Sequence, residues 1–304
     1  MIIAPRMEPV IIDSNVDVEE SGIDVYSDDT DYIVGDYTQV NGTFNRIYRC
    51  ISDSTGLNPS LDVNAESGTG SKWIDKGSTN YYRAFDVSSS SKCKNSESIY
   101  YKFAVNDVDV LMLSGLKALS VRVVTSSADD TVIFDKTYDT STRDVYDWQD
   151  WLTAPLEFMS SFFAIIPFGY GLNLEVFIEN AGGDAEVGHF VFGRSKSVGL
   201  SLMDPAPTST MRSLTSKSRD SNGNIITRKI TRFKRMNITC LIDSKSIDII
   251  EDRLNSLADT PCIFVGDDSD GGYKALLIYG EIKDHDMPIG VSKTTYKLEV
   301  EGYI

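Results

Sequence analysis

Residues 172–179 alternate apolar and polar side chains almost without interruption, in the order Leu, Asn, Leu, Glu, Val, Phe, Ile, Glu. A β-strand points successive side chains to opposite faces of its sheet, so this period of two predicts a strand with one face in a core and the other in water. Residues 295–302, near the end of the chain, show the same alternation. These segments constrain the chain to a fold built on half-buried β-strands.

Short β-prone runs recur between polar turns from residue 79 to residue 201. Residues 121–123 and 132–134 are typical of strands, and a turn signal at 181–184 leads into a further run at 187–192. Many short strands separated by turns are typical of an antiparallel sandwich. We therefore expect a mainly β protein in which residues 79–201 form an antiparallel β-sandwich of jelly-roll type.

Trp148 and Trp151 stand three positions apart inside this region, beside Asp147 and Asp150. Two interpretations fit this pair. In one, the rings stack on a sugar while the carboxylates accept hydrogen bonds from its hydroxyls. In the other, a single turn of helix closes the open end of the sandwich with both rings, and this is the interpretation we favour.

Residues 1–30 are predicted to form an N-terminal acidic arm. An apolar patch at residues 10–12 is followed by seven carboxylates, at Asp13, Asp17, Glu19, Glu20, Asp24, Asp28 and Asp29. A solvated arm of this kind would dock on a partner or on a neighbouring subunit. Calcium is the alternative, because Asp13, Asn15 and Asp17 open like a calcium loop. However, Val18 stands where such a loop needs Gly, and no Glu closes it.

Residues 202–304 change character, because basic residues gather between positions 212 and 235 of an otherwise acidic chain. Asn222-Gly223 marks a turn in this segment, so the basic residues are expected to line two arms of a long hairpin. Three interpretations stay open: self-assembly against the acidic arm, contact with DNA in a channel, or an ordinary solvated face. For the first, the candidate assembly interface is Arg228, Lys229, Arg232, Lys234 and Arg235.

Beyond the hairpin, apolar residues recur at helical spacing at Ile247, Ile250, Leu254 and Leu257, with β-prone runs before and after them. Residues 202–304 are therefore predicted to form a β-rich assembly domain with one helix packed on its sheet. The acidic loop at 267–272 is interpreted as a hairpin tip. A calcium loop that begins at residue 267 would need Glu where Ile278 stands.

The whole chain excludes several classes of function. Its 304 residues carry a net charge of −16, which opposes general binding to nucleic-acid phosphates. No basic region with an apolar core opens the sequence and no run of about 20 apolar residues occurs, so neither a signal peptide nor membrane insertion is expected.

The four cysteines form no close pair, so neither a metal site nor another cofactor is expected. P-loop, HExxH and GxSxG motifs are missing, and His189 and His285 fit no nucleophilic pattern, so we assign no catalytic residue and expect no enzyme.

Residues 31–78 are predicted to form a small aromatic hairpin domain. Asn41-Gly42 lies between two β-prone runs and favours a primed turn, because both residues tolerate positive φ angles. The spacing of aromatic, Gly-Asp, Asn-Gly, Tyr, Pro and Trp resembles the small chitin-binding type of carbohydrate-binding module. The resemblance implies a sugar-binding surface at Tyr32, Tyr37, Tyr48 and Trp73.

The chain departs from that module at residues 52–55. They read Ser-Asp-Ser-Thr where the sugar-binding members carry exposed aromatic rings. The alternative, which we favour, is that the four aromatic residues form the core of a domain too small to have much else to bury.

A second resemblance covers most of the chain after Tyr32. In a group of tailed-bacteriophage virion proteins, a Trp precedes an Asn-aromatic-Arg-x-Phe-Asp run, and here Trp73 precedes Asn-Tyr-Tyr-Arg-Ala-Phe-Asp at 80–86. Residues 188–193, 261–266 and 279–280 are also similar to that group. The resemblance implies a non-enzymatic structural component of the tail, a tail-tip, baseplate or tail-ring protein, made in the host bacterial cytoplasm and located in the virion.

The partners that this resemblance implies are copies of the chain itself, in a symmetric ring or around a fibre, and other phage tail proteins. Such a protein would also support host attachment. The alternative is a glycan-binding accessory adhesin, a lectin, whose partner is a host cell-surface glycan.

Overall fold

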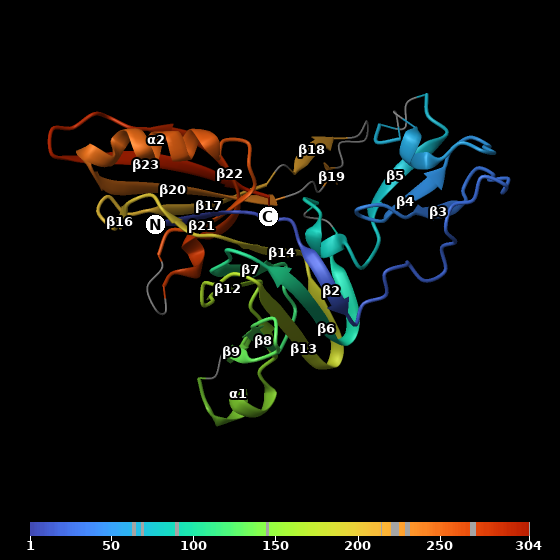
Figure 1. Cartoon of the computed structure of the whole chain (residues 1–304), viewed down its shortest axis with the longest axis horizontal. Coiled ribbons are helices and arrows are strands. Elements are labelled where there is room, and N and C mark those ends of the chain that lie inside the picture. Colours follow the sequence, from blue (N-terminus) through green and yellow to red (C-terminus); the bar gives the residue numbers. More distant parts are fainter. Residues whose placement is uncertain are drawn as a thin grey trace.

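The computed structural model describes residues 1–62, 65–67, 70–88, 91–143, 146–213, 215–219, 225–228, 232–267 and 272–303, without the side chains at 216, 217 and 226–228. Strands dominate these residues, and all paired strands in the described sheets run antiparallel. The expected mainly β fold, with a small hairpin module, a sandwich and a helix-bearing C-terminal unit, is confirmed (Figure 1).

The sandwich packs a five-stranded sheet, β2-β6-β13-β8-β9, against a three-stranded sheet, β12-β7-β14. The predicted alternation is confirmed in β13, because Leu174, Val176 and Ile178 are fully buried while the residues between them are partly exposed. The strand bounds are β2 (Val10–Ser14), β6 (Cys93–Val105), β13 (Leu172–Val187), β8 (Ser120–Ser126), β9 (Val132–Asp139), β12 (Ser161–Ile165), β7 (Val110–Ser114) and β14 (His189–Gly193).

An eight-stranded sheet forms the second large unit, and helix α2 (Ile247–Ser256) packs on one of its faces. Ile247, Ile250 and Leu254 bury their side chains there, as their spacing predicted. Asp243 caps the turn η3 (Ser244–Ser246) that leads into the helix, since its side chain accepts a hydrogen bond from Lys245 N. The strand bounds in sheet order are β15 (Lys196–Ser197), β1 (Ile2–Pro5), β21 (Cys262–Val265), β22 (Leu277–Asp286), β23 (Lys293–Gly302), β20 (Arg232–Asp243) and β16 (Leu200–Leu202), and β17 (Thr208–Ser213) also pairs with β20.

The three-stranded sheet joins the two units through β7 and β14, whose residues are all buried. Leu111 and Leu113 of β7 face the sandwich core. Val110 and Met112 alternate with them and pack against residues of the eight-stranded sheet such as Ile263. The predicted boundary between residues 201 and 202 therefore does not separate two independent cores, because apolar side chains on both faces of one strand bind it to both layers.

The N-terminal residues correct the prediction of an acidic arm over 1–30. β1 lies between β15 and β21, and its Ile3 and Ala4 are completely buried. The Met1 ammonium donates a hydrogen bond of 2.7 Å to the Gly199 carbonyl, and β2 pairs with β6 of the sandwich. The apolar residues of β1 place that strand in a core, and Ile11 of β2 packs half-buried against the sandwich core, so these residues do not form a free arm.

The small module is a three-stranded sheet of β3 (Tyr37–Val40), β4 (Arg46–Cys50) and β5 (Trp73–Ser78), with the short turn η1 (Pro59–Leu61) beside it. The predicted hairpin exists, but its primed turn at Asn41-Gly42 is wrong. Residues 41–45 join the strands, neither Asn41 nor Gly42 has a positive φ, and Gly42 N donates to Asn45 Oδ1 at 3.1 Å. The side chain of Asn45 therefore closes a longer loop. Turn η2 (Arg83–Phe85) then leads back to the sandwich and buries Phe85 in its core.

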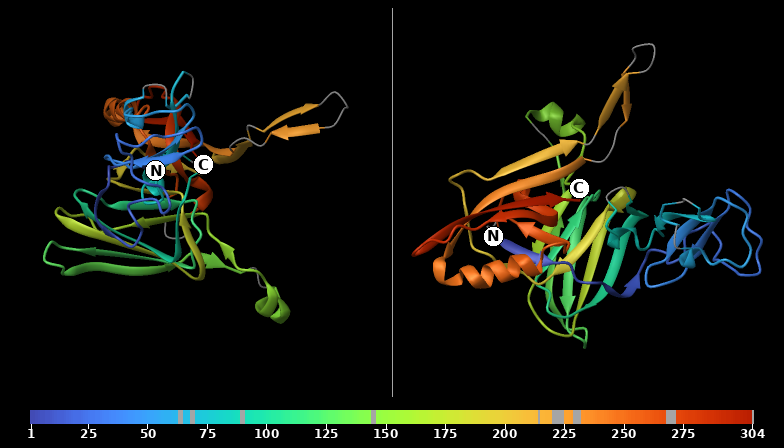
Figure 2. Two further views of the ribbon diagram at one scale, coloured as in Figure 1. Left: turned by 90° about the vertical axis from the view of Figure 1, so that its right-hand side faces the viewer. Right: turned by 90° about the horizontal axis from the view of Figure 1, so that it is seen from above.

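Two slender elements leave this body in different directions (Figure 2). One is the two-stranded ribbon of β18 (Ser216–Arg219) and β19 (Ile225–Arg228), which continues the hairpin of β17 and β20. The other is the short helix α1 (Trp148–Thr153), carried on the ribbon of β10 (Ser141–Thr142) and β11 (Glu157–Phe158). Within the described ranges, none of the helices has the length and apolar character needed to cross a membrane.

Candidate functional site: two projections and a groove

The aromatic residues of the small module form its core. Trp73 is completely buried, and Tyr32 and Tyr48 are 7% and 6% exposed. The Trp73 ring lies 5.1 Å from that of Tyr32, and its Nε1 donates to the Leu57 carbonyl at 3.1 Å. A ring that stacks on a sugar must present its face to solvent, so the sugar-binding surface predicted at Tyr32, Tyr48 and Trp73 is wrong. The preferred alternative, a small aromatic core, holds for these three residues.

Tyr37 differs from them because its side chain is 48% exposed. The guanidinium carbon of Arg49 lies 5.9 Å from the Tyr37 ring centroid, at the edge of the range for a cation–π contact. Of the four predicted sugar-binding residues, Tyr37 alone presents its ring on the surface, without the other three beside it as a platform.

His189 and the four cysteines are buried. His189 Nδ1 lies 3.2 Å from Ser114 Oγ, but these residues are 1% and 3% exposed. The His189 ring lies 5.3 Å from the ring of Tyr279 in the eight-stranded sheet, where the two large units meet. Burial lowers the pKa of His189 to about 4. All four cysteines are buried and unpaired, and burial raises the pKa of Cys93 to about 11. A substrate cannot reach these groups in this conformation, and a thiol with a raised pKa is a poor nucleophile at neutral pH.

The basic hairpin, defined as residues 208–235, has the predicted two arms. β17 pairs with β20, and β18 pairs with β19, whereas the turn at Asn222-Gly223 lies outside the described residues. Arg232 is exposed. Arg228 belongs to β19, but its side chain is not among those described, and Lys229 lies outside the described residues.

Lys234 and Arg235 do not have the free surface charges expected of an interface. Arg235 forms ion pairs with Glu299 at 2.9 Å and with Glu301 at 2.7 Å. Lys234 Nζ donates to the Leu277 carbonyl at 2.9 Å, and burial lowers the pKa of this ammonium group. Both side chains have partners on the body of the protein, Lys234 at the carbonyls of residues 274 and 277 and Arg235 at two carboxylates of β23, and they fasten the base of the basic hairpin there. Their assignment to the assembly interface is therefore wrong.

The aromatic finger, defined as residues 146–153, shows that the favoured interpretation of the tryptophan pair is wrong. Trp148 is 77% exposed and Trp151 is 66% exposed, so the rings do not close the end of the sandwich. Asp147 caps α1 by accepting a hydrogen bond of 2.8 Å from Asp150 N. The cap satisfies one backbone N–H in the first turn of α1, and the helix lies outside the core, with none of its residues buried.

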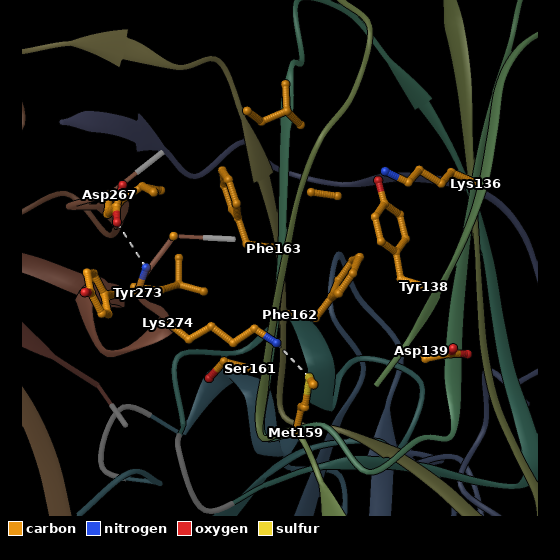
Figure 3. Close-up of a pocket in the computed structure, with 15 residues that line it drawn as sticks. Lys136, Tyr138, Asp139, Met159, Ser161, Phe162, Phe163, Asp267, Tyr273 and Lys274 are labelled. Carbon is orange, nitrogen blue, oxygen red and sulfur yellow. Dashed lines mark hydrogen bonds between the residues drawn. The ribbon is translucent and has the colours of Figure 1, made fainter. Parts of the chain in front are cut away.

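A groove lies between the sandwich and the eight-stranded sheet and has a volume of about 400 Å³. Figure 3 shows Lys136 and Tyr138 on one side of it, Tyr273 and Lys274 on the other, and Phe163 between them. Lys274 belongs to the turn η4 (Lys274–Leu276). The sequence offered no signal for this groove, because its lining comes from segments between residues 136 and 277 that only the fold brings together.

Comparisons of the chain with protein-family models, with curated proteins and with solved structures found no match. Among the described residues, no group of three or more His, Cys, Asp or Glu side chains is placed to hold a metal ion. The candidate functional surfaces are therefore the basic hairpin, the aromatic finger and the groove, all of them suited to contacts with other molecules.

Proposed function

We propose that the chain is a non-enzymatic structural component of a bacteriophage tail, a tail-tip, baseplate or tail-ring protein that assembles with copies of itself and with other tail proteins. The observation that carries self-assembly is the basic hairpin. The assignment to a tail takes its support from the sequence resemblance at Trp73 and residues 80–86. The protein is then made in the host bacterium and located in the virion.

The outer part of the basic hairpin, the ribbon of β18 and β19, extends beyond the body with little to stabilise it. All six residues of β17 are exposed, and β18 and β19 pair only with each other in the described sheets. A two-stranded ribbon alone is marginally stable in water, because it orders backbone without burying much apolar surface. A surface of another subunit that covers the ribbon would supply the missing burial.

The charges of this extension favour a second copy as that partner. Arg212, Arg219 and Arg232 are exposed on it, in a chain with a net charge of −16. Exposed carboxylates gather elsewhere, between residues 17 and 29, where Asp17 and Asp28 are examples. The described structure therefore presents a basic projection and an acidic surface on the same molecule, and such opposite patches attract between copies.

Sedimentation velocity over a range of protein concentrations tests this proposal. The wild type should form an oligomer that dissociates as salt is raised, because salt screens exposed charges. The triple variant Arg212→Glu, Arg219→Glu and Arg232→Glu should lose the salt-sensitive part of this assembly and should need a higher protein concentration to assemble than the wild type. A matched control reverses three exposed lysines elsewhere, Lys76, Lys245 and Lys293, and should assemble like the wild type.

A wild-type protein that sediments as a monomer at every concentration would count against self-assembly. The tail assignment has its own test, which is to follow the tagged protein through purification of phage particles. Loss of the protein from particles during gentle washing would contradict a structural place in the tail. The lectin alternative has lost its predicted platform, since Tyr32, Tyr48 and Trp73 are core residues.

A further inference from the structure

Four large apolar side chains of the aromatic finger lie mostly in solvent. Tyr146 is 89%, Trp148 77%, Trp151 66% and Leu152 64% exposed. Positions three and four apart share one face of a helix, so Trp148, Trp151 and Leu152 form a single apolar face. Each tryptophan buries about 150–250 Å² when covered. An exposed cluster of this kind marks a contact surface.

The chain's own fold does not cover this face. Five of the six residues of α1 are exposed and Asp150 is half-buried. The ribbon below it pairs Ser141 with Phe158 and Thr142 with Glu157, and it carries the finger away from the sandwich (Figure 2). The apolar face is therefore left exposed to solvent.

The groove has the chemistry to receive such a face. Phe163 and Ile165 contribute apolar surface to it, and Tyr138 and Tyr273 contribute rings. A volume of about 400 Å³ falls within the roughly 300–1,000 Å³ typical of ligand pockets. The groove therefore offers space and aromatic contacts for an indole ring.

Two lysines at the groove fit the charge of the finger. Lys274 Nζ contacts Met159 Sδ at 2.7 Å, and Lys136 Nζ lies 4.7 Å from the Tyr138 ring centroid. Within the described ranges, neither lysine forms an ion pair. The finger carries Asp147 and Asp150, and residues 144–156 contain no Lys or Arg.

Asp139 and Asp267 also line the groove, so both signs of charge are present there. Asp267 Oδ2 accepts a hydrogen bond from Tyr273 N, which engages part of that carboxylate. The chain has a net charge of −16, so most of its surface would repel the carboxylates of the finger. At the groove, Lys136 and Lys274 offset this repulsion.

We propose that the aromatic finger of one copy docks in the groove of a second copy, with Trp148 or Trp151 on the apolar lining and the finger carboxylates beside Lys136 and Lys274. This inference rests on the self-assembly proposed above but uses a different surface. Because the finger and the groove are different patches, the contact is heterologous, and it closes a ring or extends a filament according to the rotation between neighbours.

A bilayer is a poorer occupant for the finger. Anionic lipid surfaces attract basic segments, whereas the finger carries aspartates and the chain is strongly acidic. A glycan that stacks on the two tryptophans remains the competing class of ligand, and the experiment below distinguishes it.

A mixing experiment tests the docking. The finger variant Trp148→Ala/Trp151→Ala keeps its groove, and the groove variant Lys136→Glu/Lys274→Glu keeps its finger. All four side chains are on the surface or at the groove, so both variants should fold, which circular dichroism checks. In the background with Arg212, Arg219 and Arg232 reversed to Glu, each variant alone should be monomeric by sedimentation. Their mixture should form a one-to-one heterodimer, because a single intact finger meets a single intact groove.

The result separates this proposal from its competitors. If fingers pair with each other, the groove variant alone will dimerise and the mixture will gain nothing, which overturns the proposal. If the finger folds onto its own groove, tryptophan quenching by acrylamide will be low at every concentration, which also overturns it. Protection from quenching by added chitin oligosaccharides while the chain stays monomeric would establish the glycan instead.

Failure of the docking remains distinguishable from failure of the proposed function. The parent with an intact basic hairpin is sedimented beside each variant. A parent that assembles, together with no heterodimer in the hairpin-reversed mixture, would overturn only the finger contact, whereas a parent that never assembles contradicts self-assembly itself.

Discussion

The guanidinium of Arg235 on β20 forms an ion pair of 2.7 Å with the carboxylate of Glu301, its cross-strand partner on β23. The Arg235 side chain is 12% exposed, and it also pairs with Glu299. This contact lies at the base of the basic hairpin and connects the projecting arm to the last strand of the chain.

Removing this cation is expected to destabilise the fold. Arg235→Ala removes the closer cation from two carboxylates and leaves only Lys283, which lies 3.2 Å from Glu299 and 3.9 Å from Glu301. We expect a loss of about 2 kcal/mol in the free energy of unfolding, measured by urea denaturation. Arg232→Ala, three residues away and exposed, is the control and should change stability by no more than about 0.5 kcal/mol. Equal losses for both variants would contradict a structural role for Arg235.

Trp73 is expected to hold the small module together. Trp73→Ala removes the largest fully buried side chain and its hydrogen bond to Leu57, and it should destabilise the module by about 3–5 kcal/mol. Limited proteolysis should then cut within residues 31–78 while the sandwich stays intact. Tyr37→Ala, on the surface of the same sheet, should leave the cleavage pattern unchanged. A resistant Trp73→Ala variant would show that the module does not depend on this core.

Gly280 is expected to tolerate no side chain. A Cβ at this position on β22 would overlap the Glu301 carbonyl oxygen and stand 2.6 Å from Gly302 Cα, and both are backbone atoms of β23 that cannot swing away. Gly280→Ala should therefore lower the thermal unfolding midpoint markedly. The same change at Gly42, where the nearest atom within reach is the Phe44 carbonyl oxygen at 3.8 Å, should leave it nearly unchanged. Similar midpoints for the two variants would refute the close approach of β22 and β23.

His189 is expected to make stability depend on pH. Burial lowers its pKa from 6.5 to about 4 in the folded chain, so between these values the unfolded chain binds more protons than the folded one. Stability should be full above pH 6.5 and fall as the pH drops toward 4, by up to about 3 kcal/mol. Urea unfolding from pH 7 to pH 4 measures this slope. The difference between the wild type and His189→Gln isolates the contribution, and equal slopes for the two proteins would contradict it.

The mainly β fold was predictable because strand alternation is a local property. The alternation at residues 172–179 and 295–302 predicts which side chains face a core. The structure buries Leu174, Val176 and Ile178 as this pattern predicts. The helix at 247–256 was predictable for the same reason, since Ile247, Ile250 and Leu254 repeat at helical spacing.

The candidate surfaces were less predictable. The sequence drew attention to Trp148 and Trp151 and to the basic segment from 212 to 235. It did not predict which of these side chains are exposed to solvent. Lys234 and Arg235 turn onto the body because β22 and β23 supply carbonyl and carboxylate partners there. Spacing along a chain carries no information about partners that are 40 to 66 residues away.

The sequence by itself determined the class of secondary structure, the paired arms of the basic hairpin and the aromatic content of the small module, since each depends on neighbours a few positions away. Only the tertiary structure decided that Trp73 is a core residue while Trp148 is 77% exposed, that β1 enters the eight-stranded sheet, and that a groove lies between the two large units. Burial depends on what other segments cover a side chain, and that is settled when distant strands pack and exclude water.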